Sequence, residues 1–183
     1  RAPRPVRGLQ VSGQLSRPRR LERADALTEF SSGAADLDTW LIKFAWQNQR
    51  ANTATTYVTC ADTRVVGYYA VTVAAYDRAA APTVLAERAP RQIPCILLAR
   101  LAVDRGYQGS GLDAALLRDA LERAVFVSDQ IAAKAVLVHA RDDRARDFYL
   151  ANGDFLQSPV EPMHLFAPMK ALAAVFGARP RQR

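Results

Sequence analysis

The chain has 183 residues, half of them hydrophobic, and its formal net charge is +7. This length suits one α/β domain with a full hydrophobic core, and the spread of apolar residues along the chain excludes a disordered protein. The apolar runs are shorter than the roughly 20 residues that span a bilayer and no apolar segment follows the arginine-rich start, so we expect no membrane anchor and no signal peptide, and we expect the protein in the cytoplasm.

The first segment in chain order is basic. Residues 1–20 carry six arginines and no acid, and residues 177–183 carry three arginines and no acid, so the body between them has a small negative charge. We therefore divide the chain into a flexible basic arm (1–20), a folded domain (21–176) and a basic tail (177–183). Such an arm either contacts phosphates or keeps the protein soluble, and the sequence leaves both roles open.

The first half of the domain has the pattern of a helix and a hairpin. Apolar residues at the spacing of one helical face predict a helix over 36–46. Two runs rich in β-branched and aromatic residues, 55–60 and 65–74, are separated by four residues and predict an antiparallel hairpin. Three prolines make 77–94 a surface connection that holds one helical turn.

The second half alternates strands and helices. The predicted elements are a strand over 96–103, an amphipathic helix with its apolar stripe from Leu112 to Ala124, a strand over Ala135–His139, a helix over 143–151 and extended pieces near 155–156 and 163–166. This order predicts an α/β domain without internal repeats.

Cysteines and histidines are few. Cys60 and Cys95 each lie in an apolar strand-like run, which is typical of a buried structural thiol rather than of a disulfide or a metal ligand. His139 lies in an apolar strand and is interpreted as a core histidine, with a general base as the alternative. Since His164 is the only other histidine and no Cys/His cluster occurs, we expect no metal site.

A glycine-rich turn joins the predicted strand 96–103 to the helix that follows. The turn reads Gln108-Gly109-Ser110-Gly111, and the first amides of the next helix have no intrahelical partner. These amides and the helix dipole favour an anion, and glycine lets the backbone approach it closely. The turn therefore predicts a phosphate or pyrophosphate site, although many such turns contain glycine for conformational reasons alone. The motifs of P-loop and dinucleotide-binding proteins are absent.

Several segments resemble a known family. Segments 98–104 (LARLAVD) and 108–112 (QGSGL) resemble the coenzyme A motif of the GNAT (Gcn5-related N-acetyltransferase) family. One branch of this family is similar over residues 20–170, through segments 30–33 (FSSG), 37–41 (LDTWL), 67–70 (GYYA), 138–140 (VHA), 145–149 (ARDFY) and 158–159 (SP). That branch comprises the GNAT toxins of bacterial type II toxin–antitoxin modules, which acetylate the amino group of aminoacyl-tRNA and stop translation.

The resemblance implies a fold, a cofactor and partners. The fold is a mixed central sheet flanked by helices, and the enzyme is an acetyl-CoA-dependent N-acetyltransferase that needs no metal. The implied partners are aminoacyl-tRNA, a ribbon-helix-helix antitoxin and a second copy in a homodimer. The implied acetyl-CoA contacts are Leu101, Ala102, Val103, Gln108, Gly109, Ser110, Gly111, Leu112, Asp113 and Phe148.

The resemblance also implies roles in the reaction. A backbone N–H near Leu101–Val103 stabilises the oxyanion, and Tyr149 is the acid that protonates the leaving thiolate. Five arginines flank the implied site and are candidates for contacts with tRNA phosphates: Arg100, Arg105, Arg141, Arg144 and Arg146. An α-amino group, with a pKa of about 7.7–8.0, is roughly one tenth neutral at pH 7, whereas a lysine is almost fully charged. Because no general-base pair stands out, an α-amine is favoured over a lysine as the acceptor.

Two positions depart from the family pattern. Asp113 stands where glycine or alanine is usual, which places a carboxylate near the pyrophosphate; alternatively, Ser110 and Asp113 form a helix-capping box. Residues 152–155 (NGDF) stand where glycine usually directly precedes phenylalanine. Two alternatives therefore remain: a GNAT enzyme for a small-molecule or protein amine, and a non-catalytic GNAT-like domain that binds a partner.

Overall fold

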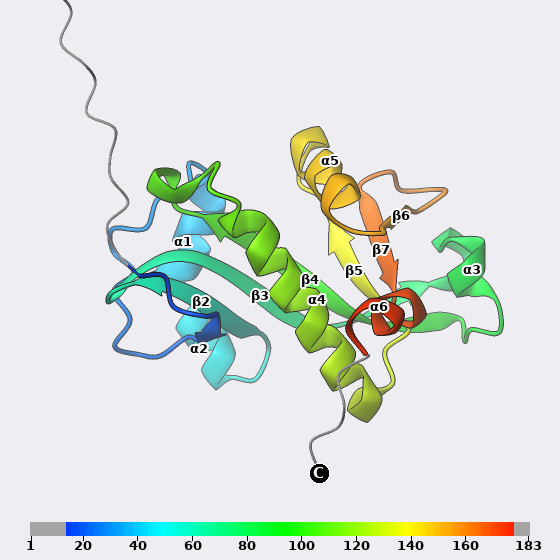
Figure 1. The fold of residues 1–183 in the computed structure, drawn as a ribbon. Helices are drawn as coiled ribbons and strands as arrows, with labels where there is room; N and C mark the ends of the chain where they lie inside the picture. The colour runs from blue at the N-terminus through cyan, green and yellow to red at the C-terminus, as the bar shows by residue number, and fades with distance from the viewer. Residues whose placement is uncertain (1–13, 178–183) are drawn as a thin grey trace, which may run out of the picture.

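The computed structural model describes residues 14–177 (Figure 1). Residues 1–13 of the expected basic arm and residues 178–183 of the expected tail lie outside the described residues, together with their arginines. Within the described part of the expected arm, Arg19 and Arg20 pair with the edge of the sheet, and Arg19 forms an ion pair with Asp25 at 2.6 Å.

A mixed sheet forms the centre of the molecule. In residues 14–177 its strands are β1 (Arg19–Arg20), β2 (Thr55–Ala61), β3 (Arg64–Asp77), β4 (Gln92–Val103), β5 (Ala135–His139), β6 (Leu156–Gln157) and β7 (His164–Pro168). Their order across the sheet is β1-β2-β3-β4-β5-β7-β6. Neighbours are antiparallel except β4 and β5, which are parallel and joined through a helix. The α/β fold with a mixed central sheet, expected from the sequence, is confirmed.

Helices cover both faces of this sheet (Figure 1). The described helices are α1 (Ala35–Lys43), α2 (Ala45–Arg50), α3 (Thr83–Ala86), α4 (Leu112–Ile131), α5 (Asp143–Asn152) and α6 (Met169–Phe176), with short 3₁₀ turns at Arg78–Ala80 and Arg105–Tyr107. Helix α4 crosses one face, and α1 and α2 lie on the other. No helix within residues 14–177 has the length and apolar character needed to cross a membrane.

The hydrophobic core follows from the alternation of side chains along the central strands. On β4, Ile96 and Leu98 pack with α4, whereas Cys95 and Leu97 pack with the core beneath α3. The core beneath α1 and α2 lies on the same face as that beneath α3, because both take alternate residues of β3 such as Tyr68 and Tyr76. The sheet thus has an α4 face and an α1–α3 face.

Two predicted elements differ from the structure, and one helix was not predicted. The single helix expected over 36–46 is wrong: Phe44, with a φ of −118°, separates α1 from α2. Strand β4 begins at Gln92, earlier than predicted, and Pro94 lies within it, where it faces Ala75 of β3 and accepts a hydrogen bond from the amide of Lys134. Helix α6 was not predicted.

Candidate active site

Strands β4 and β5 part at the middle of the sheet. Their last pair is Leu98↔Val138, so residues 99–103 of β4 have no strand partner on the β5 side (Figure 1). The register of β4 against β3 also shifts here, because Ala70 faces Arg100 and Val71 faces Leu98, which leaves Ala99 as a bulge. After the bulge, Leu101 and Val103 pack on the α4 face. The backbone expected to receive acetyl-CoA is therefore the unpaired part of β4.

The glycine-rich turn has an open backbone at the start of α4. Gly109 and Gly111 have φ values of +75° and +83°, and a side chain at either position would meet nothing within 4 Å. Gly111 is the N-cap of α4 and has no side chain that could accept from the first amides of the helix. The amides at the start of a 20-residue helix thus face an open, exposed turn, which is the geometry of an anion site.

A buried carboxylate anchors this turn to the N-terminal part of the domain. The side chain of Asp104, 4% exposed, accepts hydrogen bonds from the amides of Ser31 and Gly106 and pairs with Arg64 at 2.9 Å. The Gln108 amide group donates to the carbonyls of Ser32 and Val103 at 2.8 and 3.0 Å. The sequence analysis missed this role of Asp104, although an acid directly between a strand and a glycine turn is a usable signal for such an anchor.

Ser110 and Asp113 do not form the capping box considered from the sequence. The Ser110 hydroxyl donates to the carbonyl of Tyr107 at 2.6 Å, and Asp113 accepts from the next amide, that of Ala114, at 2.8 Å. The capping-box interpretation is wrong because Gly111, not Ser110, holds the N-cap position. Asp113 remains a carboxylate in the first turn of α4, and Leu112 beside it is buried in the core.

Tyr149 lies on α5 and packs in the core of the α4 face. It is 7% exposed and contacts the rings of Phe148 and Phe155 edge-on, at centroid distances of 5.2 and 5.7 Å. Burial raises the pKa of its hydroxyl above the ordinary value, so the hydroxyl keeps its proton at neutral pH. Within residues 14–177 we find no hydrogen bond to this hydroxyl, which leaves it free to donate to a bound molecule.

The arginines proposed for tRNA differ in their surroundings. Arg100 is partly exposed and stacks over Trp40 on the α1–α3 face, and Arg105 lies against Gly33. Arg141 pairs with Asp36 of α1 at 3.2 Å.

On α5, Arg146 pairs with Asp143 and Asp147 at 2.7 and 2.9 Å, whereas Arg144 is exposed. Arg100, Arg105 and Arg144 thus have cationic groups without an ion pair among the described residues. The charges of Arg141 and Arg146 are partly neutralised.

His139 is not the core residue expected from its strand. The four residues before it in β5 are buried, but its own side chain is exposed. Its ring stacks on His164 of β7, with centroids 4.1 Å apart, and His164 Nδ1 lies 2.9 Å from the hydroxyl of Tyr76. His139 is the last residue of β5, and its side chain is exposed at this end of the strand.

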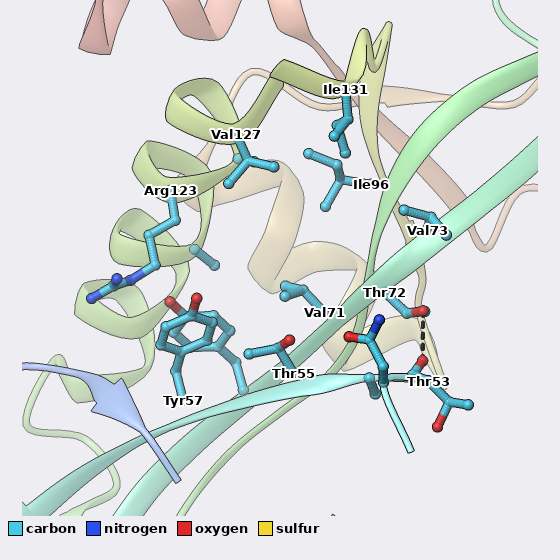
Figure 2. Close-up of a pocket in the computed structure, with 15 residues that line it drawn as sticks. Thr53, Thr55, Tyr57, Val71, Thr72, Val73, Ile96, Arg123, Val127 and Ile131 are labelled. Carbon is cyan, nitrogen blue, oxygen red and sulfur yellow. Dashed lines mark hydrogen bonds between the residues drawn. The ribbon is translucent and has the colours of Figure 1, made fainter. Parts of the chain in front are cut away.

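A groove of about 320 Å³ lies elsewhere on the α4 face (Figure 2). It runs between β2, β3 and the C-terminal half of α4, and its walls include Tyr57, Val71, Val73, Arg123 and Val127. Figure 2 shows that these side chains come from the sheet and from the helix. Because the glycine turn is at the opposite end of α4, the groove is separate from the candidate anion site.

Both cysteines are free and buried, as the sequence predicts. Burial raises the pKa of each thiol, to about 11 for Cys95, so both stay protonated. No group of His, Cys, Asp and Glu side chains that could hold a metal ion occurs in the described part of the chain.

Known proteins are similar to this chain in sequence and in fold. The model of the acetyltransferase (GNAT) family matches residues 20–153. The chain is 46% identical over 162 residues to the tRNA-acetylating toxin of Mycobacterium tuberculosis (strain ATCC 25618 / H37Rv), which covers 88% of this chain and 97% of that protein.

Two solved structures are similar throughout. AtaT complexed with acetyl-methionyl-tRNAfMet superposes with a TM-score of 0.82 at 27% identity, covering 89% of this chain and 99% of that chain. A tyrosine-to-phenylalanine mutant of the AtaT toxin, bound to the C-terminus of the antitoxin AtaR and acetyl-CoA, superposes with a TM-score of 0.75 at 26% identity, covering 90% and 99%.

Proposed function

Because this chain belongs to the acetyltransferase (GNAT) family, we propose that it transfers the acetyl group of acetyl-CoA to the α-amino group of aminoacyl-tRNA and thereby blocks translation as the toxin of a toxin–antitoxin pair. The observation that carries this proposal is the uncapped N-terminus of α4 behind an open glycine turn, in a chain nearly half identical to a tRNA-acetylating toxin along its length.

The turn and β4 fit acetyl-CoA. A pyrophosphate binds to backbone amides with no side chain in between, and the open backbone at Gly109 and Gly111, in front of the first turn of α4, supports such a site. The pantetheine arm and the acetyl group would then lie along the unpaired residues 101–103, with Leu112 and Phe148 as apolar neighbours. Acetyl-CoA supplies the activated acetyl group, and a backbone amide of residues 101–103 is the oxyanion donor.

Tyr149 is the proton donor for the leaving thiolate in this proposal. Its hydroxyl is protonated, has no hydrogen-bond partner among the described residues and belongs to the core that includes Val103 and Leu112. A thiol with a pKa of about 8.5 leaves more readily when a positioned acid protonates the sulfur as negative charge develops.

The acceptor approaches from the α1–α3 face. Arg100 lies on this face beside the parting strands. Arg105 is exposed shortly before the glycine turn, and Arg144 is exposed on α5. Arginine pairs well with phosphate, so these residues would contact the tRNA backbone, joined by Arg141 and Arg146 where phosphate competes with their present carboxylate partners. The arginines within residues 1–13 and 178–183, which lie outside the described residues, would add cations to this contact.

The comparison also supports a protein partner. An antitoxin binds the similar toxin AtaT through its C-terminus. We infer that this chain also has an antitoxin, of the ribbon-helix-helix type, that it forms a homodimer, and that it acts in the cytoplasm, where tRNA is charged. Co-expression with the protein encoded beside it, followed by co-purification and size-exclusion chromatography, tests the antitoxin and the dimer together.

Radiolabelled acetyl transfer tests the function. The protein is incubated with labelled acetyl-CoA and total tRNA, either charged or deacylated. We expect label on charged tRNA alone, and its release by mild alkali that hydrolyses the aminoacyl ester. Label on deacylated tRNA, or label resistant to alkali, would contradict the proposal.

A further inference from the structure

His139 stands where strands β4 and β5 part. Since Leu98↔Val138 is their last pair, His139 is the first residue of β5 without a partner on β4. Its exposed imidazole is thus beside the unpaired stretch 99–103, along which the acetyl group would lie.

His139 and Tyr149 belong to opposite faces of the sheet. Side chains alternate along β5, so His139 lies on the face of Leu137, which packs beneath α3. Tyr149 packs with Val138 and α4 on the other face. An amine that reaches the parting strands from the α1–α3 face therefore meets His139 first, whereas Tyr149 lies behind the strands.

We propose that His139 is the general base of the reaction, the group that accepts the proton lost by the acceptor amine. This proposal rests on the proposed function and adds to it the second of the two proton-transfer groups, which the sequence offered only as the alternative to a core histidine.

The surroundings of His139 keep its imidazole neutral. Partial desolvation, and then the nearby His164, lower its pKa below the ordinary value. From the packed elements it faces His164 of β7, behind which lies Tyr76 of β3. Arg100 of β4 lies over Trp40, and in its own loop Arg141 is paired with Asp36 and with Asp142. No carboxylate contributes to the pKa of His139, so the imidazole is ready to accept a proton at neutral pH.

The stack on His164 also fixes the ring. His164 is itself held by the hydroxyl of Tyr76 at 2.9 Å, and that hydroxyl lies 3.4 Å from Ser158 Oγ. Ser158 accepts from the amides of Val160 and Glu161. His164 is therefore a positioning residue, supported from β3 and from the loop before β7.

The neutral α-amine forms a bond to the carbonyl carbon of the thioester, and its nitrogen becomes positively charged and acidic. His139 takes one proton from this nitrogen, and the bonding pair stays on nitrogen. The C–S bond breaks with its electron pair on sulfur, and Tyr149 gives its proton to that sulfur. The imidazolium then loses a proton to water and the tyrosinate takes one from water, so the products are an amide and a free thiol.

The first test uses H139Q, which keeps a polar side chain of similar length but removes the basic nitrogen. Initial rates of acetylation of charged tRNA are measured at saturating acetyl-CoA from about pH 5.5 to about pH 8.5. General base catalysis is worth 10²–10⁴-fold, and because part of the α-amine is already neutral we expect a loss of about 10²-fold with little change in the KM for acetyl-CoA.

The pH profile separates a base from a structural residue. In the wild type, both the amine and His139 must be deprotonated, so log kcat/KM for tRNA approaches a slope of about two at acid pH; in H139Q the slope falls to about one. The second variant, H139A, leaves space beside His164, and added imidazole should restore part of its rate.

The rates, the pH slope and the imidazole rescue together decide whether His139 is the base. A wild-type rate in H139Q, or a rate loss with an unchanged slope and no imidazole rescue of H139A, overturns the role of His139 while the wild type still acetylates tRNA. If the wild type itself fails to acetylate charged tRNA, the proposed function fails and this inference falls with it. Thermal melts of both variants identify any loss of fold, and imidazole rescue of the folded fraction then gives the answer.

Discussion

The free hydroxyl of Tyr149 makes phenylalanine an informative replacement at this position. In Tyr149→Phe the ring contacts with Phe148 and Phe155 remain, so the fold and the affinity for acetyl-CoA should change little. The proton donor is lost, and kcat should fall by about 10²-fold, the lower end of the usual range because water replaces part of the acid. Steady-state kinetics with acetyl-CoA as the varied substrate measure this as a change in kcat with an unchanged KM.

Tyr57→Phe is the matched control for this change. Tyr57 stacks on Tyr69 in the groove at the other end of α4, and we expect it to retain wild-type turnover. A Tyr149→Phe enzyme with wild-type kcat would contradict the role of Tyr149 as the acid.

Asp113 is a second position where we expect one side chain to change a measurable property, here the affinity for acetyl-CoA. Its carboxylate lies in the first turn of α4, close to where a pyrophosphate would bind, and like charges repel. Asp113→Asn keeps the hydrogen-bond acceptor and removes the charge, so acetyl-CoA should bind about two- to fivefold more tightly, equivalent to roughly 1 kcal/mol or less. Isothermal titration calorimetry measures this, and weaker binding by the variant would show that the carboxylate positions the turn.

At the scale of elements, the start of α4 depends on one residue with a left-handed backbone. Gly111 has a φ of +83°, which costs an alanine about 1–2 kcal/mol, although a side chain there meets no neighbour. Gly111→Ala should lower the melting temperature by roughly 2–8 °C and weaken acetyl-CoA binding several-fold, because the strain is relieved by moving the amides of the turn. Differential scanning calorimetry and titration give both values.

Gly106 offers the comparison within the same loop. Its φ is not positive, so Gly106→Ala introduces no left-handed strain and should leave the melting temperature closer to that of the wild type. Equal losses in both variants would contradict the role assigned to the backbone of Gly111.

The elements that sequence patterns predicted best are those whose local and tertiary preferences agree. The hairpin, β5 and α4 have strong periodicity, and their cores are near where the pattern places them. The break at Phe44 was not predicted because its apolar side chain continues the helical spacing while its backbone departs from it. The early start of β4 was missed because Pro94 reads as a loop residue, although its carbonyl accepts a hydrogen bond from the amide of Lys134.

The site was predicted unequally for a related reason. The glycine turn has a local signature, so its residues could be proposed from the sequence, whereas the anchor at Asp104 joins segments 73 residues apart. The position of His139 depends on where β5 stops pairing and on the bulge at Ala99, and neither has a local signal. Its strand pattern therefore suggested a core residue instead of an exposed one.

At the scale of the whole molecule, the excess of positive charge belongs to the two ends of the chain and not to the body between them. Arg1, Arg4 and Arg7 precede the described residues, whereas Arg19 and Arg20 belong to the sheet. Deleting residues 1–13 should therefore leave β1 in place while removing three cations. If these contact tRNA phosphates, the slope of log K against log salt should fall by about 0.9 for each lost contact. Filter binding at several salt concentrations measures the slope, and an unchanged slope would reduce this segment to an aid to solubility.

The central claim is that this chain acetylates the α-amino group of aminoacyl-tRNA, and the mass of the 3′-terminal aminoacyl-adenosine tests it most directly. Charged tRNA is incubated with the protein and acetyl-CoA, digested with a nuclease and analysed by mass spectrometry. We expect that one aminoacyl-adenosine or more gains a single acetyl group on its α-amine, and that Tyr149→Phe greatly slows this gain. Consumption of acetyl-CoA with every aminoacyl-adenosine unmodified, and acetyl found instead on a nucleotide base or a protein lysine, would contradict it.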